Sequence, residues 1–402
     1  METLAPAVVA VVVAHDPGPW FTDTLESLAA QDYPELSVLV LDAASTEPVA
    51  ARVAGVLPSA FVRRFEENRG FGATANEVRA MVDGADYYLL CHDDVALEPT
   101  VVHLLVEEAF RSNAGVASPK VVSWDDPGRL VHVGLTVDKG GSVEERVLPH
   151  EIDHGQHDAV RDVFVAPGGC TLVRADLFAE LGGFDPAVVA MGEDLDLCWR
   201  AQVAGARVLV VPDARVRHRE LLAAGERTLD QALVAAEDRA VAAAEAPGAV
   251  AADAIPTTPP SPVTLQELQR RHELLVVLSC YSRLHLWRVV PQVFLLALGE
   301  VVVARISGNR SRARAVVAAW RWNLAHLALI RRRRATLAGL RRIGDKEIRT
   351  LQVGGSARLS AYGRRVFQVG FHGVHADEIA AAEAAGPAVA AVAGAAESPA
   401  AD

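Results

Sequence analysis

Short, continuous apolar runs alternate with stretches of helical periodicity along the first half of the chain. Runs without polar residues at alternate positions are typical of strands whose two sheet faces are both covered. The predicted strands span residues 8–14, 37–41, 61–65, 87–91, 115–122 and 208–211, and the predicted helices span 20–31, 73–82 and 99–111. This order predicts an α/β fold with a mostly parallel sheet flanked by helices.

The second half of the chain has a different pattern. Residues 219–262 are rich in Ala and end in the run 255–262, where clustered Pro and few large apolar residues disfavour a packed core. Helical periodicity resumes at Leu265, and the Ala, Glu and Pro composition after about residue 376 again predicts disorder. We therefore expect an α/β domain over residues 1–220, a linker or loop over 221–263, a helical module over 264–375 and a disordered tail over 376–402.

Charge is unevenly distributed along the 402 residues. The chain carries a net charge of -12, which argues against a nucleic-acid binder, yet residues 265–370 contain 20 Lys or Arg against 5 Asp or Glu. Four cysteines lie far apart without CxxC spacing, so they predict reduced thiols in the cytoplasm. The first residues lack the basic start and long apolar run of a signal peptide.

The basic helical module predicts contact with a membrane surface. Arg288, Pro291 and Glu300 interrupt its longest apolar stretch, which favours an interfacial helix over a full span. The alternative is a helical hairpin packed on the α/β domain with a solvated basic face. Under the membrane prediction, the following side chains would lie at headgroup depth or face anionic lipid: Trp287, Trp320, Trp322, Arg305, Arg310, Arg312, Arg314 and the run 331–334.

Acidic and histidine residues follow several of the predicted strands. Asp42 and the turn His92-Asp93-Asp94 come directly after strands, and in a parallel sheet such residues meet at one edge. Glu193-Asp194 opens a predicted helix, where carboxylates are stabilised as anions. Paired carboxylates of this kind can bind a divalent cation and take a proton from a hydroxyl group.

An ordered series of motifs identifies the first half of the chain more closely. Residues 8–220 resemble a family 2 glycosyltransferase with the GT-A fold. The motifs are Ala14-His15-Asp16, Leu41-Asp42-Ala43, Asn68-Arg69-Gly70-Phe71-Gly72 with Asn76, His92-Asp93-Asp94, Pro167-Gly168-Gly169-Cys170, Leu181-Gly182-Gly183-Phe184-Asp185 and Glu193-Asp194 followed by His218. The run from Cys280 to His285 resembles the segment after the transferase domain in large actinobacterial membrane glycosyltransferases.

The resemblance implies a metal site and a catalytic base. Asp94 matches the metal-binding Asp and His218 a further ligand, while His92 stands where the family often has its first Asp. Because imidazole suits Mn²⁺ better than Mg²⁺, His92 predicts a preference for Mn²⁺. Asp194 matches the general base, with Glu193 supporting it or contacting the acceptor. Without the resemblance, His218 would be interpreted as a surface histidine and the carboxylates as turn or helix-start residues.

The resemblance also implies a nucleotide-sugar site. The residues assigned to it are His15, Asp42, Asn68, Arg69, Gly70, Asn76, Asp93, Gly168 and Gly169. Asp42 has the alternative of capping a turn, and both glycine motifs have the alternative of simple packing turns.

Together these features predict an inverting, metal-dependent glycosyltransferase at the cytoplasmic face of the plasma membrane. The expected donor is a UDP- or dTDP-sugar, and the expected acceptor is a cell-envelope glycan or a polyprenyl-linked one. Two other classes stay open. One is a sugar nucleotidyltransferase, although His15-Asp16-Pro17-Gly18 stands where its glycine-rich loop would be. The other is a catalytically silent module recruited to the membrane.

Overall fold

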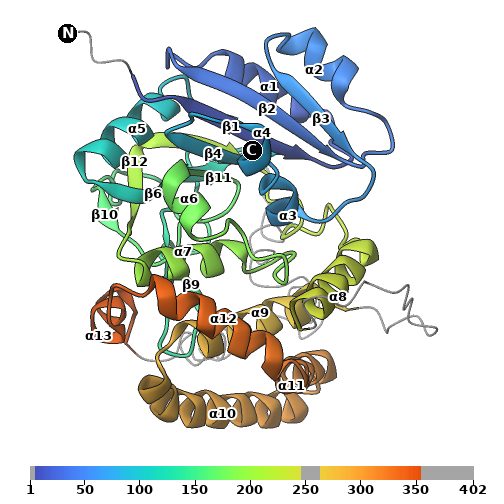
Figure 1. The fold of residues 1–402 in the computed structure, drawn as a ribbon, viewed down its shortest axis with the longest axis vertical. Coiled ribbons are helices and arrows are strands. Elements are labelled where there is room, and N and C mark those ends of the chain that lie inside the picture. The colour runs from blue at the N-terminus through green and yellow to red at the C-terminus, as the bar shows by residue number, and fades with distance from the viewer. Residues whose placement is uncertain (1–4, 246–262, 355–402) are drawn as a thin grey trace, which may run out of the picture.

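One large sheet forms the centre of the upper part of the molecule (Figure 1). The computed structural model describes residues 5–245 and 263–354. Over these residues the main sheet has 10 strands, in the order β10-β12-β6-β11-β4-β1-β2-β3, with β5 beside β12 and β7 beside β6. Two further strands, β8 and β9, pair with each other in a separate two-stranded sheet. The strand bounds are β1 Val8–Ala14, β2 Leu36–Ala43, β3 Phe61–Phe65, β4 Tyr87–His92, β5 Val95–Leu97, β6 Ala114–Ser123, β7 Leu130–His132, β8 Leu135–Val137, β9 Val143–Glu145, β10 Arg161–Asp162, β11 Cys170–Arg174 and β12 Arg207–His218.

The helices fall into a set around the sheet and a set below it (Figure 1). The first set is α1 Phe21–Ala29, α2 Ala50–Val56, α3 Phe71–Ala75, α4 Val78–Met81, α5 Val101–Arg111, α6 Ala175–Glu180 and α7 Glu193–Val203. The second set is α8 Gln231–Glu245, α9 Leu265–Cys280, α10 Arg283–Ile306, α11 Arg310–Ala325, α12 Leu327–Leu340 and α13 Asp345–Ile348, followed by a 3-10 turn at Arg349–Leu351.

The parallel strands bring the candidate residues to one edge of the sheet. Every residue of β1 is buried, as expected for a strand of Val and Ala covered on both faces. β1 pairs in parallel with β2 and β4, so Ala14 lies opposite Asp42 and Val13 lies opposite His92. The predicted convergence of Asp42 and the 92–94 turn at the carboxyl ends is therefore confirmed.

The predicted α/β class is confirmed, with three local differences. β11 runs antiparallel between β4 and β6, and the sequence pattern did not predict it. The helix expected over residues 73–82 is two short helices, α3 and α4, since the chain turns again at Asn76. Within the segment expected to be a linker, α8 forms a helix with buried Val234, Glu237 and Val241, because other helices cover its small side chains.

Other parts of the predicted organisation lie outside the described residues. These are residues 246–262 of the predicted linker, residues 355–375 of the predicted helical module and the predicted tail from 376.

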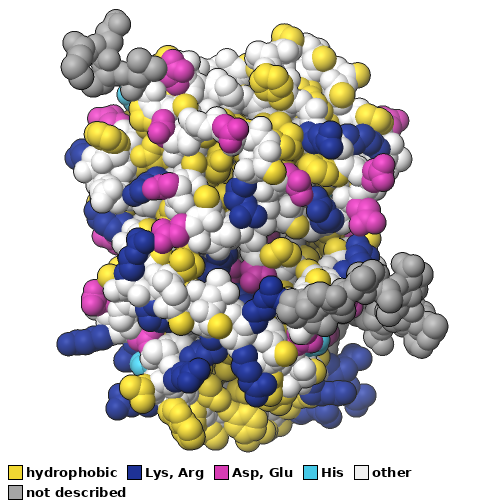
Figure 2. Space-filling model, in the orientation of Figure 1, with side chains coloured by type: hydrophobic (Ala, Val, Ile, Leu, Met, Phe, Trp, Pro, Cys, Tyr) yellow, Lys and Arg dark blue, Asp and Glu magenta, His cyan; other side chains and the backbone are white. Residues whose placement is uncertain are grey.

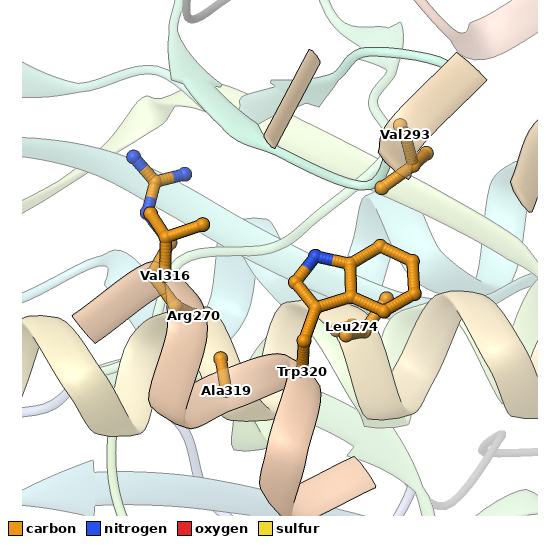
Figure 3. A pocket seen from close by; sticks show the side chains of 7 residues that line it. Arg270, Leu274, Val293, Val316, Ala319 and Trp320 are labelled. Atoms are coloured by element: carbon orange, nitrogen blue, oxygen red, sulfur yellow. The ribbon is translucent and has the colours of Figure 1, made fainter. Parts of the chain in front are cut away.

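The C-terminal helices pack directly against the sheet domain. α9 lies between α7 and α11, and its Val276, Val277 and Cys280 belong to the same core as Trp199 of α7. Figure 3 shows a small pocket among α9, α10 and α11, where Val293 and Trp320 face Leu274. The helical module and the α/β domain therefore share one hydrophobic core.

Candidate active site

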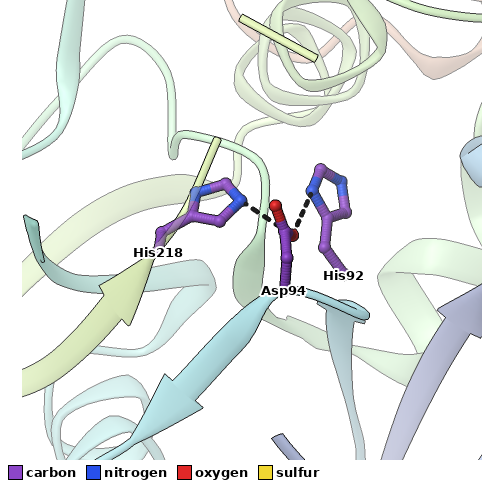
Figure 4. Close-up of side chains that lie close together, drawn as sticks. All are labelled: His92, Asp94 and His218. Atoms are coloured by element: carbon purple, nitrogen blue, oxygen red, sulfur yellow. Dashed lines mark hydrogen bonds and ion pairs between the residues drawn. The ribbon is translucent and has the colours of Figure 1, made fainter. Parts of the chain in front are cut away.

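Three side chains from separate elements meet at the carboxyl edge of the sheet (Figure 4). His92 ends β4, Asp94 lies in the turn before β5, and His218 ends β12. His218 reaches Asp94 because β12 pairs antiparallel with β5, which places His218 opposite Val95. One candidate ligand atom from each of the three residues lies within 4.8 Å of the other two.

The geometry of this cluster fits a divalent cation. His218 Nε2 lies 3.2 Å from Asp94 Oδ1, and His92 Nδ1 lies 3.8 Å from the same oxygen. Asp94 and His218 are buried, and His218 Nδ1 is a buried nitrogen without a hydrogen-bond partner. Buried polar atoms are normally satisfied, so this unpartnered nitrogen is one that a ligand at the cluster could use. The nitrogen and oxygen donors suit Mn²⁺.

Burial and mutual charge set the protonation of the cluster. Burial lowers the pKa of His92 to about 4, against the opposing effect of Asp94, so His92 is neutral at pH 7. Burial alone would raise the pKa of Asp94, but the His218 imidazole outweighs it and holds that pKa well below its usual range. Burial by itself would lower the pKa of His218, but the nearby Asp94 carboxylate has the larger effect, so the pKa of His218 is raised. Asp94 is thus an anion, and its negative charge favours the protonated form of His218.

The Gly168-Gly169 turn connects this cluster to Asp194. Gly168 N donates to Asp194 Oδ2 at 3.2 Å, and Gly169 has a φ of 100°. A side chain at Gly169 would place its Cβ 2.7 Å from His218 Cε1, so only glycine fits there. The turn therefore requires glycine at position 169, and it links Asp194 to the side of the site that holds His92 and His218.

The two carboxylates of α7 lie in its first turn, as predicted. Burial raises the pKa of Asp194, in opposition to the hydrogen bonds that it accepts from Leu195 N and Gly168 N. Burial, followed by the charge of Asp194, raises the pKa of Glu193 to about 7. Asp196 points elsewhere and is fully buried against Arg200.

The structure places some of the predicted nucleotide residues at the same edge. His15 N donates to Asp93 Oδ2 at 3.1 Å, and its ring Nδ1 lies 2.8 Å from the carbonyl oxygen of Ala43. Asp42 is 1% exposed and accepts hydrogen bonds from Ser45 N, Val49 N and Arg64. The Asp42 carboxylate is therefore satisfied within the protein, which matches the turn-capping alternative.

The residues of the glycine-rich loop have internal partners. Asn68 Oδ1 accepts a hydrogen bond from Gly70 N at 3.0 Å, and Arg69 forms an ion pair with Glu77 at 2.7 Å. Asn76 uses both its amide nitrogen and its amide oxygen on the backbone of Phe184. Asn76 thus ties the loop to the Gly183-Phe184 turn, and Arg69 is directed to a carboxylate of its own loop.

Two residues that the sequence did not indicate, Arg227 and His132, also lie at this edge. Arg227 binds Asp93, and His132 of β7 contacts Glu220 at 2.7 Å and Glu145 at 2.8 Å. Burial opposes charge on His132, but the two glutamates outweigh it and raise its pKa well above the usual range. No local motif surrounds Arg227 or His132. Asp93 lies 134 residues from Arg227, and Glu220 lies 88 residues from His132.

Several curated proteins are similar in sequence to about half of this chain. The N-acetylglucosaminyl-diphospho-decaprenol L-rhamnosyltransferase of Mycobacterium tuberculosis is 26% identical over 249 residues, which is 54% of this chain and 76% of that protein. The O-antigen biosynthesis protein RfbC of Myxococcus xanthus is 26% identical over 221 residues, or 53% of this chain, but these cover only 17% of RfbC. The pre-mycofactocin glycosyltransferase of M. tuberculosis is 28% identical over 190 residues, which is 46% of this chain and 37% of that protein.

Two solved structures are similar to this chain. GalNAc-T7 with UDP, GalNAc and Mn²⁺ has a TM-score of 0.45 and 15% identity, over 53% of this chain and 43% of its own. Residues 1–349 of S. aureus TarS have a TM-score of 0.44 and 16% identity, over 79% of this chain and 92% of their own.

The fold is an α/β sheet with carboxylates and histidines gathered at its carboxyl edge, the edge where ligands bind in sheets of this class. Residues 6–234 match the family described as "Glycosyltransferase like family 2", so more than half of the chain is covered. The chain belongs to this family, and the resemblance drawn from its motifs is confirmed.

Proposed function

We propose that the protein is a metal-dependent, inverting glycosyltransferase that moves a sugar from a nucleoside-diphosphate donor to a hydroxyl of a cell-envelope glycan. The observation that carries this proposal is the hydrogen bond from Gly168 N to Asp194. The same turn approaches His92 through Gly168 and His218 through Gly169, which supports a role for the Asp194 carboxylate next to the His92, Asp94 and His218 cluster. A transferase of this kind needs a base for the acceptor and positive charge for the leaving diphosphate.

His92, Asp94 and His218 would hold the cation. A bound Mn²⁺ or Mg²⁺ would neutralise the phosphate charge that develops as the donor breaks. Asp94 brings the negative charge, and neutral His92 brings a lone pair at pH 7. Because only neutral imidazole binds a metal and the pKa of His218 is raised, cation binding is expected to weaken as the pH falls.

Asp194 would act as general base. Its carboxylate takes the proton of the acceptor hydroxyl while the hydroxyl oxygen attacks the anomeric carbon and the bond from that carbon to the diphosphate breaks. A pKa raised by burial makes Asp194 a stronger base than an exposed carboxylate. A single displacement inverts the anomeric configuration, and NMR of the product would report it.

The relatives support the choice of donor and acceptor classes. One is named for transfer of L-rhamnose to N-acetylglucosaminyl-diphospho-decaprenol, and another for O-antigen biosynthesis. We infer a UDP- or dTDP-sugar as donor and a cell-envelope glycan, polyprenyl-linked, as acceptor. An acceptor with a lipid tail would require the enzyme to work at the inner face of the plasma membrane.

The exposed surface of α10 supports attachment at that membrane. α10 is long and apolar enough to cross a bilayer, with a mean hydropathy of 1.9 in its most apolar window. Only 22% of that window is buried inside the protein, so most of its apolar surface is free to contact lipid. Figure 2 shows hydrophobic side chains gathered at the bottom of the molecule, over α10, with Lys and Arg on both sides. The exposed apolar residues of α10 are Leu284, Trp287, Phe294, Leu295, Leu298, Val302 and Ile306.

Basic side chains border this apolar α10 face. Arg305, Arg310 and Arg314 line one shallow surface hollow at the end of α10, where they suit the phosphates of anionic lipid. Two of the arginines expected at the membrane instead point inward, because Arg333 binds Asp185 and Asp196 and Arg334 donates to the carbonyls of Leu278 and Tyr281.

The tryptophans divide in the same way. Trp287 is 83% exposed, whereas Trp320 packs edge-on against Phe294 and Trp322 lies under the Arg271 guanidinium. The surface that we propose for the membrane is therefore α10 with the start of α11.

Flotation with vesicles would test the attachment. The protein is expected to float with phosphatidylglycerol vesicles, less so at high salt, and not with phosphatidylcholine vesicles. Replacing Arg305, Arg310 and Arg314 with Gln should weaken flotation, while replacing the exposed Arg239 on α8 should not. Absence of salt-sensitive binding would contradict membrane attachment without touching the transferase proposal.

A panel of nucleotide sugars would test the transferase itself. Thermal shifts are measured with and without Mn²⁺ for the natural chain and for Asp94→Ala. A shift that needs Mn²⁺, occurs with one donor and disappears in Asp94→Ala supports the enzyme. No shift with any donor would favour the silent membrane module, which the replacement of the usual Asp by His92 suggests.

A further inference from the structure

Arg227 forms an ion pair with the carboxylate of Asp93. Its Nη2 lies 3.0 Å from both Asp93 oxygens, and Asp93 is only 1% exposed. His15 N donates to one of the same oxygens at 3.1 Å. Both oxygens of Asp93 are therefore engaged by the protein.

The chain that carries Arg227 closes over the site from one side. The segment of residues 219–230 begins directly after His218 and leads to α8, without a helix or strand of its own. Its Arg219 N donates to the carbonyl oxygen of Asp94, and its Leu221 N donates to Asp94 Oδ2 at 3.2 Å. Arg227 N in turn donates to the carbonyl oxygen of Leu221 at 2.8 Å. The 219–230 segment thus covers both carboxylates of the 93–94 turn.

Arg227 stands at the entrance and Asp93 behind it. The Arg227 side chain is 32% exposed, against 1% for that of Asp93. The pKa of Asp16 is lowered mainly by the hydrogen bond from Thr46 N and that of His92 mainly by burial, and the charge of Arg227 adds to both in the same direction. The half-buried guanidinium of Arg227 therefore lies near groups that follow β1 and end β4.

This arrangement conflicts with binding of a nucleotide diphosphate. A ribose hydroxyl can donate to Asp93 only if Arg227 moves away, and a buried carboxylate that loses its cation needs a replacement donor. The incoming diphosphate brings at least two negative charges next to Asp93 and Asp94. A guanidinium released from Asp93 matches phosphate oxygens, which it can bind in a bidentate manner.

We propose that Arg227 is a diphosphate ligand that closes the donor site in the free protein by binding Asp93. When a nucleoside diphosphate enters, hydroxyl donors of the nucleotide replace Arg227 on Asp93 and the guanidinium transfers to the phosphates. The exchange keeps both the carboxylate and the cation paired. The inference rests on the proposed function, since it requires a nucleotide site at Asp93.

Calorimetric titration of diphosphates and of nucleosides would test this exchange. UDP, dTDP, uridine and thymidine are titrated into the full chain with Mn²⁺, for the natural protein, Arg227→Ala and Arg227→Gln. Arg239→Ala is the matched control, because Arg239 is an exposed arginine of α8 that pairs with Glu67. Nucleoside binding reports only the replacement of Arg227 on Asp93 by hydroxyl groups. Diphosphate binding reports that replacement together with the binding of Arg227 to the phosphates.

The expected result is a change in the ratio of the affinity for the diphosphate to the affinity for the nucleoside. Both Arg227 variants should bind the diphosphate about tenfold more weakly, as for loss of a charge-assisted hydrogen bond, and bind the nucleoside as tightly or more tightly. Arg239→Ala should match the natural protein. An equal loss for both ligands, or no change in the ratio, would make Arg227 a permanent structural partner of Asp93 and overturn the inference alone. A natural chain that binds neither diphosphate with Mn²⁺ would overturn the proposed function and the inference together.

Discussion

His272 Nδ1 lies 2.7 Å from the carbonyl oxygen of Ala190, so a helix of the C-terminal module contacts the loop that leads into Glu193 and Asp194. The other ring nitrogen lies 3.2 Å from Glu237 of α8, and both side chains are fully buried. The loop contains two residues with positive φ, Met191 at 58° and Gly192 at 141°. The second set of helices therefore braces an unusual turn directly before the proposed base.

Removing the His272 side chain should destabilise the whole protein. His272→Ala leaves Glu237 buried without one of its partners and opens a cavity at the Met191-Gly192 turn, which should cost about 3 kcal/mol of unfolding free energy. Urea unfolding would measure the loss. His103→Ala, at a surface histidine of α5 that is 55% exposed, is the control and should change stability little. Equal effects of the two changes would mean that the brace contributes nothing.

Asp194→Asn should abolish transfer without abolishing donor binding. An amide of nearly the same shape cannot take the proton of the acceptor, so kcat should fall by roughly 10²- to 10⁴-fold. Metal-dependent binding of the donor, measured by thermal shift, should persist. Asp213→Asn on the exposed side of β12 should keep full activity. Full activity of Asp194→Asn would exclude Asp194 as the base.

The histidines of the cluster should control which metal binds. His218→Ala removes one of three candidate ligands and should weaken Mn²⁺ by about 10- to 100-fold, by analogy with loss of groups that support a metal site. His92→Asp replaces an imidazole with a carboxylate and should shift preference toward Mg²⁺. Calorimetry with each metal measures both effects. Unchanged Mn²⁺ affinity in His218→Ala would remove His218 from the proposed site.

Glu193 should make stability depend on pH. Its pKa is raised from 4.5 to about 7 by burial and by Asp194, so the folded state binds its proton more tightly than the unfolded state does. This contribution is complete below about pH 4.5 and is lost as the pH rises toward 7.

The Glu193→Gln variant should isolate that contribution. It should be more stable than the natural protein at pH 8 by about 1–2 kcal/mol, with little difference at pH 4. Chemical unfolding at both pH values measures the change. A variant that gains the same stability at both would show that ionisation of Glu193 is not its cause.

The sheet could be predicted from the sequence because its strands are continuous apolar runs. The Val8–Ala14 strand and its neighbours have a local pattern that does not depend on distant contacts, and their order at once places Asp42 and His92 at one edge. The assignments of Asp94, Asp194 and His218 came from motif order and could not be reached from composition. Short or irregular elements escaped, such as the antiparallel β11, whose five residues give too weak a pattern.

The sequence by itself determined the fold class, the family and the residue types gathered at the sheet edge, because local hydrophobic periodicity and motif order are encoded in adjacent residues. Only the tertiary structure decided which partner each charged group takes. Arg333 binds Asp196, which lies 137 residues away in the sequence, and Arg227 binds Asp93, which lies 134 residues away. The backbone N–H of Phe184 donates to the side chain of Asn76, 108 residues away. Such pairings depend on distances between elements brought together by folding, and a charged side chain has the same appearance in a sequence whether it faces lipid, a ligand or a buried carboxylate.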